Sequence, residues 1–212
     1  SVVTIGNFAG VHWGHQALLA ATKELAADRT TVAVTFDPHP VSLFRPDAAP
    51  KKLTSLARRV DLLHQAGADE VRILDFTMEM AAWSPQDFVE RVILDQCQAQ
   101  AVVVGEGFRY GNRAAGTIET LTNAGEAAGF EVTALTLAGD GETFASSRVR
   151  EAIAAGNISQ AAQILGRPPE VEGVVIEGDR RGREIGFPTA NIPVDDEYAV
   201  PPDGVYATWV NL

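Results

Sequence analysis

Cysteine and basic side chains are scarce in this sequence of 212 residues. The single cysteine, Cys97, excludes an internal disulfide and a cysteine-rich metal site, and we expect it to be a buried, small apolar residue. With 17 basic against 28 acidic residues, the net charge of −11 argues against nucleic acid as a partner, although a small nucleotide needs only a locally basic pocket.

Long apolar runs are missing as well. No stretch of about 18 apolar residues could span a bilayer, and no charged leader precedes an apolar run at the start of the chain. We therefore expect no membrane contact and a cytoplasmic location. The chain opens at Ser1 without an initiator methionine and closes at Leu212 inside an apparent strand, so both ends look cut. The oligomeric state does not follow from the sequence.

The hydrophobic content of 46% is enough for one domain of ordinary size and part of a second. Apolar strand-like runs alternate with helical stretches, which predicts an α/β fold with a parallel sheet covered on both faces and with ligands at the carboxyl ends of its strands. The expected strands are 2–5, 31–36, 70–74, 101–104 and 130–135, and the expected helices are 13–27, 53–65, 85–96, 117–128 and the region after Arg150 to about Leu165.

The character of the chain changes at Gly166-Arg167-Pro168-Pro169, and we place a domain boundary there, between 1–166 and 167–212. Short β runs at 171–176, 189–192 and 205–210 resemble the opening of a small β-barrel. About 40 residues cannot close a barrel or bury a core unaided.

The segment from Gly6 to His15 joins the first strand to the first helix. Its glycines let the backbone approach a phosphate chain, the helix start supplies unpaired N–H groups, and imidazoles can donate to developing charge. These features predict a nucleotide site. Histidines three apart at a helix start could also be a cap or half of a zinc site. The predicted site residues are Gly6, Asn7, Phe8, Gly10, His12 and His15.

This segment is similar to the Gly-x-Phe-Asp-Gly-x-His-x-Gly-His signature of adenylyl transfer in the bacterial bifunctional riboflavin kinase/FAD synthetase family. The resemblance covers nearly every residue, and five further motifs follow in the family's order. They are Thr35-Phe36-Asp37-Pro38-His39-Pro40, Val104-Gly105-Glu106-Gly107-Phe108-Arg109-Tyr110-Gly111, Ser146-Ser147-Arg148-Val149-Arg150-Glu151, Gly182-Arg183-Glu184-Ile185-Gly186-Phe187-Pro188-Thr189-Ala190-Asn191 and Pro202-Asp203-Gly204-Val205-Tyr206-Ala207.

The resemblance implies a Rossmann-like nucleotidyltransferase domain that uses ATP and Mg²⁺ to attach AMP to FMN, giving FAD and pyrophosphate. It also implies that His12 and His15 contact the ATP phosphates and that Gly105 joins the ATP site. It further implies that pyrophosphate is held by Ser146, Ser147 and Arg150, and that the Arg150 guanidinium stabilises the charge that develops on it. From the residues alone, Ser147 could be a plain N-cap and Arg150 a solvated side chain.

For the flavin site, the resemblance points to the loop after the second strand and to the aromatic side chains of two motifs. Asp37 could equally be structural in a rigid loop, and the aromatic residues could fill the core. The candidate flavin contacts are Asp37, His39, Phe44, Phe108 and Tyr110.

The second domain would, by resemblance, transfer the γ-phosphate of ATP to riboflavin. Gly178, Gly182 and Gly186 lie in a loop able to wrap phosphates, while Thr189 and Asn191 offer oxygens for Mg²⁺ and a phosphate. A glycine-rich hairpin is the plain alternative. In the family this domain continues well beyond the equivalent of Leu212 and holds its catalytic base there, so we expect a truncated flavokinase domain, no kinase activity, and poor order near 205–212.

Three positions depart from the family pattern. Ala9 replaces an Asp, Gly107 replaces an Asp or Asn, and Ala145 replaces the first Ser of a Ser-Ser-Thr run. These losses leave open a catalytically weakened flavin-binding or nucleotide-binding protein. A nucleotidyltransferase acting on another acceptor, such as pantetheine phosphate or nicotinamide mononucleotide, is the nearest enzymatic alternative, whereas a purely structural protein would not explain the glycine-histidine turn.

Overall fold

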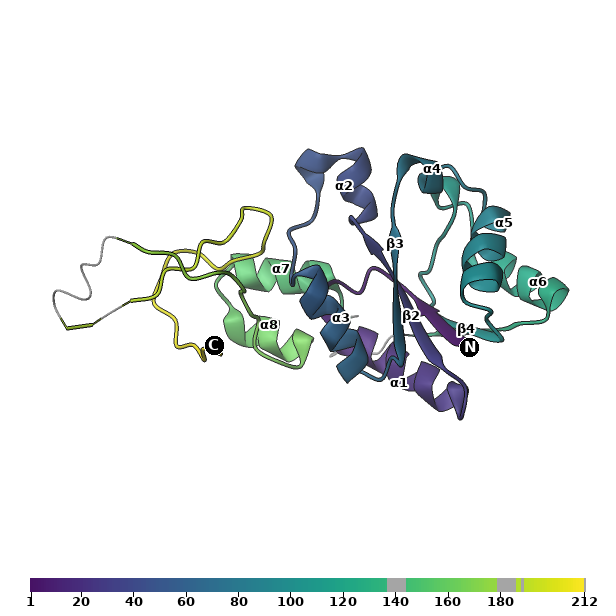
Figure 1. Cartoon of the computed structure of the whole chain (residues 1–212), viewed down its shortest axis with the longest axis horizontal. Coiled ribbons are helices and arrows are strands. Elements are labelled where there is room, and N and C mark those ends of the chain that lie inside the picture. Colours follow the sequence, from purple (N-terminus) through teal and green to yellow (C-terminus); the bar gives the residue numbers. More distant parts are fainter. Residues whose placement is uncertain (137–143, 179–185, 188, 212) are drawn as a thin grey trace.

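Five parallel strands form the centre of the molecule in a computed structural model that describes residues 1–136, 144–178, 186–187 and 189–211. The strand order is β3-β2-β1-β4-β5 (Figure 1). The predicted parallel α/β fold is confirmed. The strands are β1 Val2–Ile5, β2 Thr31–Asp37, β3 Glu70–Asp75, β4 Ala101–Gly105 and β5 Glu131–Leu135.

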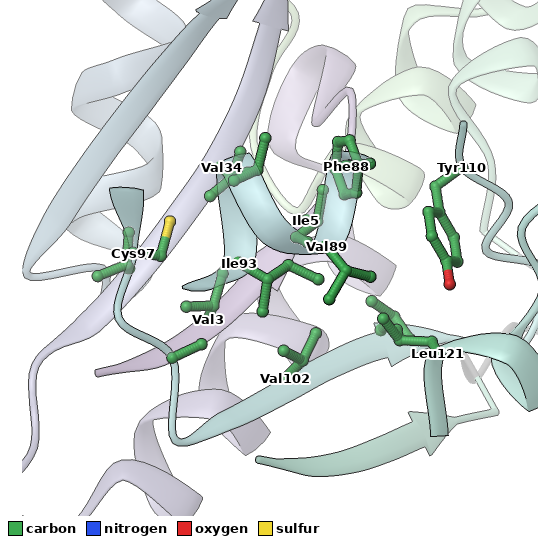
Figure 2. Packing of buried hydrophobic residues seen from close by; sticks show 14 of the residues in the cluster. Val3, Ile5, Val34, Phe88, Val89, Ile93, Cys97, Val102, Tyr110 and Leu121 are labelled. Atoms are coloured by element: carbon green, nitrogen blue, oxygen red, sulfur yellow. The ribbon is translucent and has the colours of Figure 1, made fainter. Parts of the chain in front are cut away.

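Helices cover both faces of this sheet because successive strand residues point to opposite sides. Val3 and Ile5 face a cluster that includes Phe88, Val92 and Leu121 (Figure 2). The first face is covered by α5 (Pro85–Phe88), the π-helix Val89–Gln96 that continues it, and α6 (Ile118–Ala128).

The residues between them on the strands, such as Val2, Ala33 and Val103, face a second cluster with Leu19 and Leu63. The second face is covered by α1 (Trp13–Ala26) and α3 (Leu56–Gln65). Short elements also lie in the connections: α2 (Pro40–Phe44), α4 (Met78–Ala81) and the 3₁₀ turns Ala9–Val11, Pro46–Ala48 and Asn112–Ala114.

Side-chain caps fix where the helices start. Ser84 and Asp87 form a capping box at α5, as the Ser-Pro-Gln-Asp sequence predicts. Ser55 accepts a hydrogen bond from the backbone N–H of Arg58, so α3 begins at Leu56 rather than at the predicted Leu53. The cysteine prediction is confirmed: Cys97 is 4% exposed, and burial raises the pKa of its thiol.

The order of the strands reverses between β1 and β4, because the chain moves from β1 to β2 and β3 on one side and later to β4 and β5 on the other. In open parallel sheets, ligands bind beside such a reversal, at the carboxyl ends of the strands. Gly6 directly follows β1, and Gly105 is the last residue of β4. The glycine-histidine segment therefore lies where this fold binds ligands.

Two helices follow β5 where one was predicted from Arg150 to Leu165. The first, α7 (Ser146–Ala154), begins four residues before Arg150, and the second is α8 (Ile158–Leu165). The predicted single helix is wrong because Gly156 takes a φ of 72° and turns the chain between them. Their apolar faces and Leu53 make a third cluster beside the sheet.

The described residues from 167 to 211, called the tail below, form an extended coil beside α7 and α8 (Figure 1). The predicted strands 171–176, 189–192 and 205–210 are wrong for this structure, since its described tail holds an isolated bridge between Ile176 and Asn191 and no strand. Apolar alternation produces a strand only where neighbouring backbone completes the ladder. Phe187 and Trp209 are correspondingly 75% and 94% exposed.

The tail contacts residues 1–166, called the first region below, and one of these contacts is at Lys52. The Lys52 backbone N–H donates to the Glu197 carbonyl, and its own carbonyl accepts from Ala199 at 2.8 Å. Lys52 Nζ lies 2.6 Å from a carboxylate oxygen of Glu197. Nowhere in the described ranges does a helix have both the length and the apolar character that a membrane span requires.

Candidate active site

The turn after β1 holds strained backbone. Phe8 and Val11 adopt φ values of 47° and 42°, in the left-handed region that residues other than glycine seldom occupy. Gly10 also lies there, at 74°, and a side chain on it would come within 2.9 Å of Leu53. Such strain persists only where surrounding contacts hold it, and it is concentrated at functional sites.

His12 and His15 lie at the end of this turn and in the first turn of α1. Their rings stack with centroids 3.7 Å apart, and Phe8 packs edge-on against His15 at 5.2 Å. His12 occupies the N-cap position, but its side chain makes no capping hydrogen bond. The Nδ1 atoms of both rings are buried and have no hydrogen-bond partner in the described ranges.

Burial keeps these imidazoles neutral. Burial first, and the charge of Arg150 second, lower the pKa of His12 to about 4. Burial and then the neighbouring His12 lower the pKa of His15 well below its ordinary value. A neutral ring donates one N–H and carries no charge that would need a counter-ion. The zinc alternative gains no support, because no group of three or more metal-ligating side chains exists among the described residues.

The start of α7 packs against the same turn. Ser146 Oγ donates a hydrogen bond of 2.9 Å to the carbonyl of Ala9. The N-cap of α7 is Ala145, so the alternative that Ser147 is the N-cap is wrong, and Ser147 is exposed. Arg150 is not simply solvated, since its Nε donates to the Lys51 carbonyl and burial lowers its pKa.

A cavity of about 720 Å³, called the polar cavity below, lies beside this turn. Its lining mixes charged side chains from three parts of the chain: the end of β2 with α3, the loop before α3 with α7, and the tail. The charged residues lining it, with His39, are Asp37, His39, Asp47, Lys51, Lys52, Arg59, Arg150, Asp196 and Glu197.

Several groups at the polar cavity have partners within the protein. Arg59 Nη2 donates to Asp37 Oδ1 at 3.1 Å. His39 caps α2, accepting from the Val41 backbone N–H at 3.2 Å. Burial lowers the pKa of His39, and the charges of Arg150 and Arg59 lower it further. The two arginines therefore make protonation of His39 less favourable.

A second cavity, of about 830 Å³, is lined by Gly6 and Asn7 of the same segment and is called the aromatic cavity below. Phe108 and Tyr110 stack at 5.6 Å with their rings 14° from parallel, and the Tyr110 hydroxyl lies 3.1 Å from Thr120 Oγ1. Tyr110 thus both fills the core and lines the cavity. The residues that line it include Gly6, Asn7, Phe36, Phe44, Phe76, Met80, Phe88, Phe108, Tyr110, Asn112 and Arg113.

The candidate flavin contacts are divided between the two cavities. Phe44, Phe108 and Tyr110 line the aromatic cavity, whereas Asp37 and His39 line the polar one. Of the candidate ATP residues, Arg150 lines the polar cavity and Gly6 and Asn7 line the aromatic one. The others line neither cavity: Phe8, Gly10, His12, His15, Gly105, Ser146 and Ser147. No atom lies within 4 Å of where a Gly107 side chain would begin, so the Asp or Asn of the family pattern would fit there.

The candidate kinase residues that the structure describes, Gly178, Gly186, Thr189 and Asn191, lie in the tail and line neither cavity. Ile176 donates its backbone N–H to the Asn191 carbonyl at 2.9 Å, and the Asn191 side chain packs against Gly178. Thr189 and Gly186 are exposed. Gly182 lies outside the described residues.

Sequence reasoning missed several residues of both cavities. Lys51, Lys52 and Arg59 line the polar cavity without belonging to any motif, and Phe36 and Phe76 line the aromatic one. A signal for the two phenylalanines was present, because Phe36 lies near the end of β2 and Phe76 directly follows β3, where ligands of a parallel sheet are expected.

The chain resembles known proteins throughout. Residues 1–149 match the FAD synthetase family, and residues 165–212 match the riboflavin kinase family. The bifunctional riboflavin kinase/FMN adenylyltransferase of Escherichia coli strain K12 is 38% identical over 212 residues, which cover 99% of this chain and 67% of that protein. The protein of the same name from Bacillus subtilis strain 168 is 37% identical, with 98% and 66% covered.

A solved structure agrees with these matches. The crystal structure of a protein from Streptococcus pneumoniae, described as a macrolide-efflux protein, superimposes with a TM-score of 0.86 at 32% identity and covers 97% of this chain and 68% of that one. The chain thus spans about two thirds of the length of these relatives. Together with the sheet and the turn after β1, the matches show that the chain belongs to the bifunctional riboflavin kinase/FMN adenylyltransferase family.

Proposed function

We propose that residues 1–166 transfer AMP from ATP to FMN, forming FAD and pyrophosphate. One observation carries the proposal: the segment after β1 contributes lining residues to both cavities, Gly6 and Asn7 to the aromatic cavity and Ala9 to the polar cavity. A flavin needs the first kind of surface for its ring system, and a triphosphate needs cations of the second kind. The turn between them is where the acceptor phosphate and the α-phosphate would meet.

In this reaction an oxygen of the FMN phosphate attacks the α-phosphorus of ATP. The new P–O bond forms as the bond from that phosphorus to pyrophosphate breaks, and a dianionic phosphate has no proton to lose. Catalysis is therefore mostly positioning and electrostatic stabilisation. The neutral rings of His12 and His15 would donate N–H groups to phosphate oxygens, and Arg150 would follow the charge onto the leaving pyrophosphate.

The described residues offer no cage for a bare metal ion, since no cluster of three or more ligating side chains exists among them. This donor set fits Mg²⁺ that arrives on the nucleotide phosphates, and Asp37 of the polar cavity is a carboxylate that could complete its shell. Bound in that way, Mg²⁺ would neutralise part of the phosphate charge.

Residues 167–212 we assign to the beginning of the riboflavin kinase module, in which Gly178, Gly182 and Gly186 would approach ATP and in which Thr189 and Asn191 would hold Mg²⁺ and a phosphate. ATP, FMN and riboflavin are then the partners of the protein. A cytoplasmic location fits such a biosynthetic role.

Chromatographic detection of FAD, after the purified chain is incubated with FMN, ATP and Mg²⁺, tests the proposal. The Ala9→Asp variant runs beside it, and a riboflavin-only reaction detects kinase activity. FAD from the unmodified chain supports the adenylyltransferase. FMN and ATP binding without FAD from either chain would instead favour a binding protein, and pyrophosphate release with another acceptor would favour a different nucleotidyltransferase.

A further inference from the structure

Arg59 is the one Lys, Arg, Asp or Glu side chain of the described residues that is buried, with 8% of its surface exposed. Its charge cannot be shed, because a guanidinium stays protonated at any working pH. Removing such a group from water is costly unless it is paired and hydrogen-bonded. A buried arginine beside a ligand cavity therefore calls for a physical reason.

The hydrogen bonds of Arg59 supply that reason. Nη1 donates to the carbonyl of Asn7 at 3.1 Å, and Nη2 donates to Asp37 Oδ1 at 3.1 Å. One planar fork thus ties the turn after β1 to the end of β2 from its place in the first turn of α3. Its Nε is buried without a hydrogen-bond partner in the described part of the chain.

The Asn7 carbonyl lies at the start of the strained backbone. It is followed directly by Phe8, whose φ is 47°, and it also accepts from Thr35 Oγ1 at 3.2 Å. Two buried donors therefore hold one carbonyl. Because unusual dihedral angles persist only when neighbours over-determine them, these donors help to keep Phe8 and the following residues in place.

Both ends of the Arg59 fork reach cavity walls. Asn7 lines the aromatic cavity, whereas Asp37 and Arg59 line the polar cavity. A displacement of the Asn7 backbone would change the separation of a ligand in one cavity from a ligand in the other. Misplacement by about 1 Å can cost on the order of 100-fold in rate.

We propose that Arg59 is a positioning residue for adenylyl transfer, which acts by fixing the Asn7 carbonyl and the Asp37 carboxylate on the two sides of the wall between the cavities. The inference rests on the proposed function. It assigns Arg59 no contact with substrate. Both the charge and the planar fork matter, because a lysine ammonium at the same place is a point donor that cannot span both acceptors in the same geometry.

The adjacent residue on α3 provides a matched control. Arg58 pairs with Glu170 of the tail at 2.9 Å, its side chain is 27% exposed, and it lines neither cavity. We compare the full chain with Arg58→Gln, Arg59→Lys and Arg59→Met in steady-state FAD formation. Arg59→Met keeps much of the volume but removes both hydrogen bonds of the fork, so the Asp37 carboxylate loses its Arg59 partner.

For Arg59→Lys we expect kcat to fall about 10- to 100-fold, with KM for ATP and for FMN changed less than about threefold, because an alignment is lost rather than a binding contact. Arg59→Met should lose at least as much, and Arg58→Gln less than about twofold. If Arg59→Lys keeps the kcat of the unmodified chain, or if the two Arg59 variants lose activity only in proportion to a fall in folded fraction, the proposal is overturned.

Amide hydrogen exchange provides a readout that does not need turnover. In the absence of ligands, Arg59→Lys should speed exchange in the segment 6–11, and Arg58→Gln should not. Unchanged exchange in that segment for Arg59→Lys would overturn the positioning role, whether or not FAD forms. Failure of the unmodified chain and Arg58→Gln to form any FAD, with exchange changed as expected, would overturn the proposed function but support the positioning of the turn.

Discussion

Val3 and Val205 carry the same side chain but differ in burial, because they lie in two different regions of the chain. Val3 lies in β1 with a hydrogen-bonded strand on each side and is completely buried, whereas Val205 lies in the tail and is 103% exposed. Both occur in apolar runs. The difference teaches that burial here depends on neighbouring backbone that completes a ladder, and the first region has it while the described tail does not.

The largest expected difference between the two regions is in how a substitution changes the rate of FAD formation. His12→Asn removes a donor from the strained turn, and we expect FAD formation to fall about 10²- to 10³-fold. Trp209→Ser, a change at a side chain that is 94% exposed in the tail, should leave the rate within about twofold. Turnover measured with saturating FMN and ATP checks both variants. Equal losses would show that the two regions form one catalytic unit.

The pH dependence of stability should belong to the first region. The pKa of His12 falls to about 4 on folding, so between about pH 6.5 and pH 4 the unfolded chain binds a proton that the folded chain refuses. Stability is therefore lost as the pH falls, by about 3 kcal/mol at pH 4 from His12 alone, and the lowered pKa values of His15 and His39 act in the same direction.

Urea unfolding at a series of pH values measures this loss. His12→Asn should flatten the dependence, with His64→Asn, at the exposed end of α3, as the control. A slope changed equally by both substitutions would contradict the assignment to the buried turn.

Gly10 in the first region and Gly186 in the tail have similar φ angles but differ in how closely other atoms pack around them. Gly10→Ala meets both a φ of 74° and a contact at 2.9 Å with Leu53, and we expect it to lower the free energy of unfolding by about 2 kcal/mol. Gly186, with a φ of 84°, has no atom within 4 Å of the added carbon. Gly186→Ala meets the backbone strain without the clash, so it should lower the urea midpoint less than Gly10→Ala does, and a comparable loss in both variants would break the distinction.

The smallest effect concerns one of the contacts between residues 1–166 and the tail. The Lys52–Glu197 ion pair is exposed on both sides, so Glu197→Gln should shift the melting temperature by less than about 2 °C. Ala199→Pro removes the backbone donor to the Lys52 carbonyl and should speed proteolytic cleavage within the tail more than Glu197→Gln does. Cleavage rates that rank in the opposite order would show that the side chains, not the backbone, anchor the tail.

Local patterns predicted much of the first region. The strands and long helices followed from apolar periodicity and caps. His12 and His15 were expected in one site, and residues three positions apart at a helix start lie on the same face. The break at Gly156 and the short helix Pro40–Phe44 were missed, since such short elements leave little periodicity to detect.

Long-range contacts set the limit for the rest. Arg59 reaches Asn7 across 52 positions, so no local pattern could have marked it. Arg150 was marked by its motif, but its contact with the Lys51 carbonyl, 99 positions away, could not be predicted from that motif. For the same reason, the sequence placed Asp37 and Phe44 in one flavin site, although they line different cavities. The roles of these side chains in binding stay predictions.

The acidic stretch of the tail gives the polar cavity a further property. Asp196 and Glu197 belong to its wall, opposite the cations Lys51, Lys52 and Arg150. An anion that enters the polar cavity must compete with these carboxylates for the cations, so anion binding would replace one ionic contact with another. If an anion competes with Glu197 for Lys52, release of the tail would strengthen anion binding by the same factor by which the bound anion weakens the tail contact.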